Sequence, residues 1–98
     1  MQVALEAIAH PGRRRMLELV MQRERQAGEL AELTRMTQPA ASQHLRVLRQ
    51  AGLVEVRRDG QRRLYHVNFA ALQTLRAQLD DFWGERLSAL QKATKARK

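Results

Sequence analysis

Apolar residues recur every three or four positions along most of this chain, which is the spacing of helices that bury one face. The pattern predicts a short helix over residues 2–9, a second that opens at Pro11, a third after a break at Gln26–Gly28, and a fourth over Gln38–Gln50. Proline suits a first turn, since the N–H that it lacks has no partner there. A mainly helical fold with a minor sheet is therefore expected.

The fourth helix has one apolar edge and one polar edge. Thr37 is a suitable N-cap, and Pro39 lies in the first turn, where proline is tolerated. Ala41, Leu45 and Leu48 fall at i, i+4 and i+7 and are expected to face the core. The other face carries Gln38, Pro39, Ala40, Ser42, Gln43, Arg46 and Arg49. With the third helix and the tight break before it, this helix predicts a helix-turn-helix.

The polar edge of the fourth helix fits the major groove of duplex DNA. Its small residues let the first turns approach base edges, and the amide of Gln43 has the donor and acceptor pair that matches adenine. Ser42 and Gln43 are therefore the candidates for reading bases. Arg46 and Arg49 lie further along, where contact with phosphate is expected. An ordinary solvated surface helix is the alternative.

A hairpin is predicted next, with Asp59-Gly60 as a two-residue type I′ turn. The register then pairs Val54 with Tyr65, Val56 with Arg63 and Arg58 with Gln61. Valines and the tyrosine share a face that packs on the helices. Arg57 and Arg62 lie opposite each other beside the turn, where two like charges are destabilising by up to about 1 kcal/mol. An anionic partner relieves this repulsion, so we interpret the hairpin as a wing that follows DNA phosphates or enters the minor groove, with a solvated loop as the alternative.

The last helix begins at Phe69 and carries a single apolar stripe. Its members are Leu72, Leu75, Leu79, Phe82, Trp83, Leu87 and Leu90. Spacings of three and four are typical of a coiled-coil edge, and each side chain that becomes buried contributes roughly 1.5 to 3 kcal/mol. We therefore expect a homodimer assembled through this stripe and the first helix, with Val3 and Ile8 at the interface. The alternative is a helix that folds back on its own domain.

The composition narrows the class of protein. With 98 residues the chain makes one domain, which we place at residues 1–91, followed by a basic, disordered tail at residues 92–98. Absence of cysteine excludes disulfides, thiolate metal sites and cysteine nucleophiles. No glycine-rich phosphate loop and no serine, histidine and carboxylate set is present, so an enzyme is not expected. The sequence also has no signal peptide and no apolar stretch of membrane-spanning length, so a cytoplasmic protein without membrane contact is expected.

The net charge of +8 is unevenly placed. Residues 37–66 carry +4, from six basic and two acidic residues, and the tail from Lys92 carries a further +4. This distribution suits nucleic acid, although anionic lipid or a merely soluble surface also fits it. Arg13, Arg14 and Arg15 crowd the first turn of the second helix, where positive charge opposes the helix dipole. We expect them to face either solvent or an anionic partner.

Three segments together carry a resemblance that covers residues 1–91. The segments AHPGRRRMLELV, GELAELTRMTQPAASQHLRVLRQAGLV and RRDGQRRLYHV resemble the ArsR/SmtB type of winged helix-turn-helix bacterial repressor. This resemblance implies a homodimer that assembles through its first and last helices, binds an inverted repeat in a promoter and represses transcription, commonly of its own operon. The helix Gln38–Gln50 is then the recognition helix, and Asp59-Gly60 is the tip of the wing. The residues assigned to double-stranded DNA are Gln38, Pro39, Ala40, Ser42, Gln43, His44, Arg46, Arg49, Arg57, Arg58 and Arg62.

The metal sites of the founding members of that family do not carry over. Those members bind metals through cysteines in the helix that matches Glu29–Arg35, or through Asp, His and Glu ligands on the last helix. Here the first segment reads ELAELTR, and the last helix has no histidine. His10, His44 and His66 lack a convincing ligand spacing, so a structural or DNA-proximal role is expected for each. The chain thus resembles the metal-independent branch, which often carries an FW-x-x-RL segment like Phe82–Leu87, and no metal, cofactor or effector is assigned.

The main rival function is a protein-interaction module that has kept the fold but lost DNA binding. Its signature is neutral substitution of the DNA-facing positions, whereas Gln43, Arg46, Arg57 and Arg62 are all polar or charged. A membrane-surface protein needs an amphipathic helix with a basic flank, whereas residues 67–91 are slightly acidic. The sequence therefore predicts a sequence-specific DNA-binding regulator.

Overall fold

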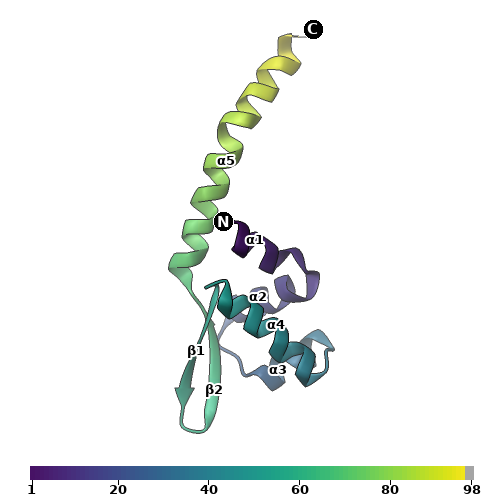
Figure 1. Cartoon of the computed structure of the whole chain (residues 1–98), viewed down its shortest axis with the longest axis vertical. Helices are drawn as coiled ribbons and strands as arrows, with labels where there is room; N and C mark the ends of the chain where they lie inside the picture. The colour runs from purple at the N-terminus through teal and green to yellow at the C-terminus, as the bar shows by residue number, and fades with distance from the viewer. Residues whose placement is uncertain (97–98) are drawn as a thin grey trace.

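The computed structural model describes residues 1–96 and contains five helices and one antiparallel hairpin (Figure 1). In chain order the elements are α1 (Gln2–Ala9), α2 (Pro11–Gln22), α3 (Ala27–Thr34), α4 (Gln38–Gln50), β1 (Val54–Asp59), β2 (Arg62–Val67) and α5 (Phe69–Ala96). Helices α1 to α4 cluster together, the hairpin lies along one side of the cluster, and α5 runs away from the upper end of the hairpin (Figure 1). The predicted mainly helical fold with a small sheet is confirmed.

A short turn joins α3 to α4. Arg35 adopts a left-handed backbone with φ of 57°, and the N–H of Met36 donates to the carbonyl of Ala31 over 2.9 Å. Thr37 then caps α4, since its hydroxyl accepts a hydrogen bond from the N–H of Ala40 at 3.3 Å. The predicted cap and the predicted helix-turn-helix are confirmed.

The buried edge of α4 is the one that its spacing predicts. Ala41, Leu45 and Leu48 are at most 1% exposed. They pack in one cluster with residues of α1, α2, α3 and the hairpin. The largest side chains fully enclosed there are Met16, Leu30, Leu45, Leu48, Leu53 and Val54. Because the apolar edge of α4 is fixed in this core, its polar edge is held toward solvent.

The register of the hairpin differs from the predicted one. Its strands pair Val54 with Val67, Val56 with Tyr65, Arg58 with Arg63 and Asp59 with Arg62. The two loop residues are therefore Gly60 and Gln61, and of these only Gly60 has a positive φ, 65°. A type II′ turn needs a positive φ only at its first central position, whereas the predicted type I′ turn needs one at both. As a result Arg57 lies opposite Leu64 and not opposite Arg62.

A buried arginine ties the α2–α3 connection to the second strand. The backbone of Arg25 exchanges two hydrogen bonds with that of Tyr65, at 3.1 and 2.8 Å. The side chain of Arg25 donates to the carbonyl of Leu19 at 2.8 Å and also to the side chains of Gln22 and Glu29. A cation is favourable at the C-terminal end of α2 because of the helix dipole. These contacts hold β2 beside the start of α3.

Helix α5 leaves the rest of the molecule along its length (Figure 1). Near its start Leu75 is 7% exposed, whereas Trp83 is 50% and Leu90 63% exposed. The near part of the stripe therefore rests on its own domain, and the far part is uncovered in the single chain. On α1, Ile8 is half-buried and Val3 is exposed. Within residues 1–96 the helix does not fold back on its domain.

The basic segment after Gln91 is more ordered than we expect from the sequence. Residues 92–96 continue α5 as helix. Alanine and lysine favour helix, and the hydroxyl of Thr94 donates to the carbonyl of Leu90 at 2.9 Å. The structure thus continues α5 through residues 92–96, where the sequence predicts a disordered tail, while residues 97 and 98 lie outside the part of the chain that the structure describes.

Candidate nucleic-acid interface

The polar edge of α4 is open to solvent along the helix. The exposed side chains are Gln38, Pro39, Ser42, Gln43, Arg46 and Arg49. Ala40, the remaining residue of the predicted edge, is half-buried at its margin. The edge thus begins with small and uncharged side chains in the first turns and ends with two arginines.

His44 occupies a different place from the other α4 residues assigned to DNA. It is half-buried, and its ring lies 4.5 Å from the ring of His10. Its Nδ1 lies 3.4 Å from a guanidinium nitrogen of Arg13. His10 itself caps α2, because its Nδ1 accepts a hydrogen bond from the N–H of Gly12 at 3.0 Å. Burial, followed by the nearby His10 and Arg13, lowers the pKa of His44 below its usual value.

The three arginines at the start of α2 have separate surroundings. Arg13 donates to two carbonyls in the last turn of α1, where positive charge is favourable. Arg15 forms an exposed ion pair with Glu18 at 3.4 Å. Arg14 is exposed, and its side chain makes no hydrogen bond within residues 1–96. Arg13 therefore serves the packing of α1 on α2, and Arg14 is the one of the three whose side chain has no partner among residues 1–96.

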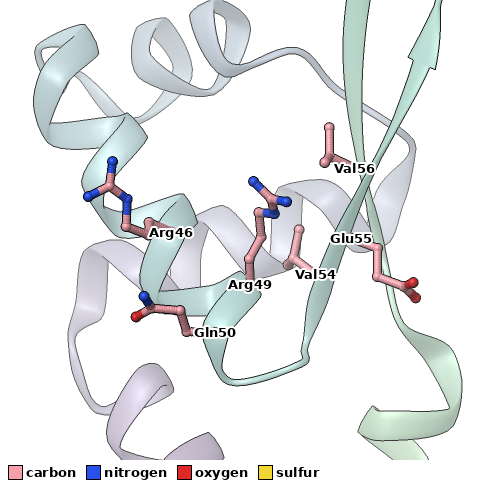
Figure 2. Close-up of a pocket in the computed structure, with 6 residues that line it drawn as sticks. All are labelled: Arg46, Arg49, Gln50, Val54, Glu55 and Val56. Atoms are coloured by element: carbon pink, nitrogen blue, oxygen red, sulfur yellow. The ribbon is translucent and has the colours of Figure 1, made fainter.

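An open hollow of about 470 Å³ lies between the C-terminal half of α4 and β1 (Figure 2). Arg49 extends over this gap beside Val54, and Val56 points into it from the strand (Figure 2). Arg46 points outward from the helix, and Glu55 points away on the far side of β1 (Figure 2). The hollow thus has two arginines on its helix side, and on its strand side two valines with Glu55 at its margin.

The arginines of the hairpin divide between its two faces. Side chains alternate along a strand, and directly opposed residues share a face. Arg58 and Arg63 therefore share the face of Val54 and Val56, which is turned toward α4 (Figure 2). Among residues 1–96 neither of them has an acidic partner. Sequence reasoning missed Arg63, although a type II′ turn at Gly60 places it opposite Arg58.

Arg57 and Arg62 lie on the other face, and both are paired with carboxylates. Nε of Arg57 donates to both carboxylate oxygens of Glu24 at 3.0 Å, and Arg62 meets Asp59 at 2.6 Å. The hydrogen bonds from Arg57 lower the pKa of Glu24 below its usual value, and Glu24 raises the pKa of Arg57. The predicted repulsion between Arg57 and Arg62 is therefore wrong, because each charge has an acidic partner within the chain.

The part of the chain that the structure describes offers few other candidate sites. Among residues 1–96, no group of three or more His, Cys, Asp or Glu side chains is placed to hold a metal ion. None of the helices there combines the length and the apolar character that crossing a membrane requires. The exposed edge of α4 and the wing beside it remain the principal candidate site.

Comparisons with known proteins agree with this geometry. Residues 10–56, from the cap of α2 into β1, match the family described as bacterial regulatory protein, arsR family. The HTH-type transcriptional regulator Rv2034 of Mycobacterium tuberculosis is 40% identical over 85 residues, which are 87% of this chain and 79% of that protein. The transcriptional repressor SdpR of Bacillus subtilis is 36% identical over 74% of this chain and 81% of its own length.

Solved structures share the fold as well as the sequence. A possible transcriptional regulator for arsenical resistance is 43% identical with a TM-score of 0.75, over 88% of this chain and 93% of the other. The homodimeric winged helix-turn-helix DNA-binding domain of Mb0332 from Mycobacterium bovis is 32% identical with a TM-score of 0.70, over 88% of this chain and 80% of the other. The chain therefore belongs to the ArsR family of bacterial regulatory proteins, and it is a winged helix-turn-helix transcriptional regulator rather than an enzyme.

Proposed function

We propose that two copies of this chain bind an inverted repeat in a promoter and repress transcription from it. The observation that carries this proposal is the exposed polar edge of α4 beside a wing face whose arginines, Arg58 and Arg63, have no acidic partner within residues 1–96. Residues 37–66, which contain both surfaces, carry a charge of +4 from six basic and two acidic residues. Such a surface attracts the phosphates of duplex DNA.

Within α4 the contacts divide by position along the helix. Ser42 and Gln43 are exposed near its start, and we propose that they read base edges in the major groove. Gln38, Pro39 and Ala40 shape the first turn that enters the groove. Arg46 and Arg49 follow toward the end of the helix, where they meet phosphates. His44 supports the helix from the side of α2 and takes no base contact in this proposal.

For the wing we propose that Arg58 and Arg63 contact phosphates directly. Both lie on the face turned toward α4. Arg57 and Arg62 contribute less, because each must exchange a carboxylate for a phosphate before it contacts DNA. Exposed ion pairs are weak enough for such an exchange to occur near a polyanion.

We propose that the second copy covers the stripe on α5. Phe82, Trp83, Leu87 and Leu90 are between 37% and 63% exposed in the single chain, which is a large apolar area for one helix. The similar domain of Mb0332 is described as homodimeric. Two recognition helices related by a two-fold axis then read half-sites about 34 Å apart, one turn of the duplex.

We further propose that this regulator does not respond to a metal held at the family's two known places. The segment that matches the cysteine site reads ELAELTR, and α5 contains no histidine. Thiolate and imidazole groups are the ligands that zinc and similar ions prefer. We therefore assign no metal signal at these two places, and we expect the protein to act in the cytoplasm.

Selection of bound genomic fragments, followed by fluorescence anisotropy, tests the proposal. The recovered promoter should contain an inverted repeat, and the protein should bind it more tightly than a scrambled duplex of equal length at moderate salt. The promoter of the gene itself is the first duplex to include. Equal affinity for operator and scrambled duplex would contradict sequence-specific repression. Absence of binding to either duplex would favour the alternative function, a protein-interaction module that has lost DNA binding.

A further inference from the structure

A polar pocket of about 320 Å³ lies where α3, α4 and β2 meet. Its lining includes Gln26 and Gly28 at the start of α3, Ser42 on α4, and Arg63 and Tyr65 on β2. The pocket thus touches the base-reading turns of α4 on one side and the wing on the other. The pocket residues on α3 and β2 are not among those that the sequence assigns to DNA binding.

The start of α3 lines this pocket and has no side-chain cap. Gln26 is the N-cap residue of α3, but its side chain makes no capping hydrogen bond. The first N–H groups of a helix have no partner within it and carry a partial positive charge. A Cβ at Gly28 would meet Nε2 of Gln38 at 3.4 Å, so the missing side chain lets the amide of Gln38 lie close to the start of α3.

Tyr65 supplies a second and independent donor. It is only 9% exposed, and its hydroxyl has no hydrogen-bond partner within residues 1–96. Every fully buried side-chain oxygen among these residues has a hydrogen-bond partner, so the unpartnered hydroxyl of Tyr65 must be accessible to solvent. Tyr65 is one of the residues that line the pocket. A tyrosine enclosed in this way normally has a partner for its hydroxyl. Backbone hydrogen bonds to Arg25 on both sides fix its position.

The charges around the pocket favour an anion. Arg63 lines it without an acidic partner among the described residues. Glu29 in the first turn of α3 is the nearby acid along the chain, but its carboxylate is held by Arg23 and by Arg25, the latter at 3.1 Å. Two arginines thus neutralise the negative charge of Glu29. The donors around the pocket include the guanidinium of Arg63, the first N–H groups of α3 and the hydroxyls of Ser42 and Tyr65.

We propose that this pocket binds one phosphate group of the DNA backbone, with the Tyr65 hydroxyl and the start of α3 donating to its oxygens and Arg63 supplying the charge. The proposal rests on the proposed function, because the phosphate belongs to the duplex that α4 reads. An inorganic phosphate ion has the same oxygens, but a DNA phosphate also has α4 beside it to hold it in place. The contact is independent of base sequence and fixes the depth at which α4 enters the groove.

Tyr65→Phe tests the pocket with little change to the fold, because it removes a hydroxyl that has no hydrogen-bond partner within residues 1–96. We expect affinity to fall about ten-fold for each pocket engaged, equally for operator and scrambled duplex. The salt dependence should stay as in the wild type, since no charge is lost. Arg63→Gln should also weaken both duplexes and should reduce the salt slope by about 0.9 per contact.

A backbone-modified operator locates the phosphate. Replacing single phosphates by neutral methylphosphonates should reveal one position in each half-site where the wild type loses affinity and Tyr65→Phe loses less, because Arg63 still contacts that phosphate in the variant. Titration with inorganic phosphate at millimolar concentration should show no saturable binding. Tyr65→Phe binding with wild-type affinity would overturn the pocket while leaving operator recognition by α4 intact, and saturable binding of inorganic phosphate with unchanged DNA affinity would overturn the assignment to DNA. Equal binding of operator and scrambled duplex by the wild type would instead contradict the proposed function. In that case a comparison of wild type and Tyr65→Phe on any duplex still tests the pocket.

Discussion

Arg57 in β1 and Glu24 in the α2–α3 connection form an ion pair across 33 residues of sequence, with Nη2 and Oε2 2.7 Å apart. The pair joins the middle of the wing to the α2–α3 connection. It also removes one arginine from the set that is free to meet DNA. The four arginines of the hairpin therefore differ in their expected contribution to binding, although their sequence positions look equivalent.

Arg58→Ala and Arg63→Ala should weaken binding to every duplex more than Arg57→Ala and Arg62→Ala do. The first two residues lie on the face turned toward α4 without acidic partners among residues 1–96. Each lost phosphate contact should reduce the slope of log affinity against log salt by about 0.9. Anisotropy titrations at several salt concentrations measure both quantities, and the opposite order of effects would contradict the division of the wing into two faces.

Glu24→Gln is the complementary variant, because it removes the acidic partner of Arg57 and not an arginine. It frees Arg57 without changing any arginine, so affinity for operator and scrambled duplex should rise together and the salt slope should steepen. The lowered pKa of Glu24 also makes the strength of its pair with Arg57 depend on pH. Its carboxylate is charged in the pair, so the stabilisation that the pair provides is present above the usual pKa of 4.5 and is lost as pH falls through the lowered value.

The helices and caps could be predicted because their signals are local. Thr37 caps α4 and Pro11 opens α2 through contacts within a few residues, and the apolar spacing of α4 names its buried edge. The register of the hairpin could not be settled, since the Asp59-Gly60 pair also fits a turn in which glycine is the first central residue. Ion pairs and ring contacts between distant segments, such as Arg57 with Glu24, depend on the folded arrangement and leave no periodic pattern.

Arg25→Ala should lower the free energy of unfolding by about 2 to 4 kcal/mol, because it leaves the buried carbonyl of Leu19 without its side-chain donor and removes one of the two arginines that pair with Glu29. Arg25→Lys should restore only part of this loss, since an ammonium cannot match the fork of a guanidinium. Urea denaturation measures the change. Arg23→Ala is the matched control, because Arg23 also pairs with Glu29 but is 62% exposed, and it should cost less than about 1 kcal/mol. Equal losses for the two variants would contradict the structural role of Arg25.

Acid should destabilise the junction between α4 and α2 through His44. Folding lowers the pKa of His44, so the unfolded chain takes up the proton more readily than the folded chain. Stability is therefore full above the usual value of 6.5 and falls as pH drops from there through the lowered value. The urea midpoint should drop between about pH 8 and pH 5 by more in the wild type than in His44→Gln. Identical drops would show that the burial of His44 does not couple to stability.

Trp83→Asp should convert the dimer to a monomer, since it places a carboxylate in the stripe that the second copy covers. Trp83 packs edge-on against Phe82, with ring centroids 4.8 Å apart, and is half-exposed in the single chain. Sedimentation velocity reports the change in mass. Ser88→Asp is the matched control, because Ser88 is exposed on the same helix outside the stripe. A dimer that survives Trp83→Asp, or is lost equally with Ser88→Asp, would contradict the placement of the interface.

The most direct measurement is the ranking of single-base operator variants by anisotropy for the wild type and Gln43→Ala. Gln43 is exposed on the polar edge of α4 and has the donor and acceptor pair that matches adenine. The wild type should lose about 1 to 3 kcal/mol at one position in each half-site, and Gln43→Ala should bind all bases there equally while keeping its affinity for scrambled duplex. An unchanged ranking of operator variants in Gln43→Ala would contradict base reading by this edge of α4.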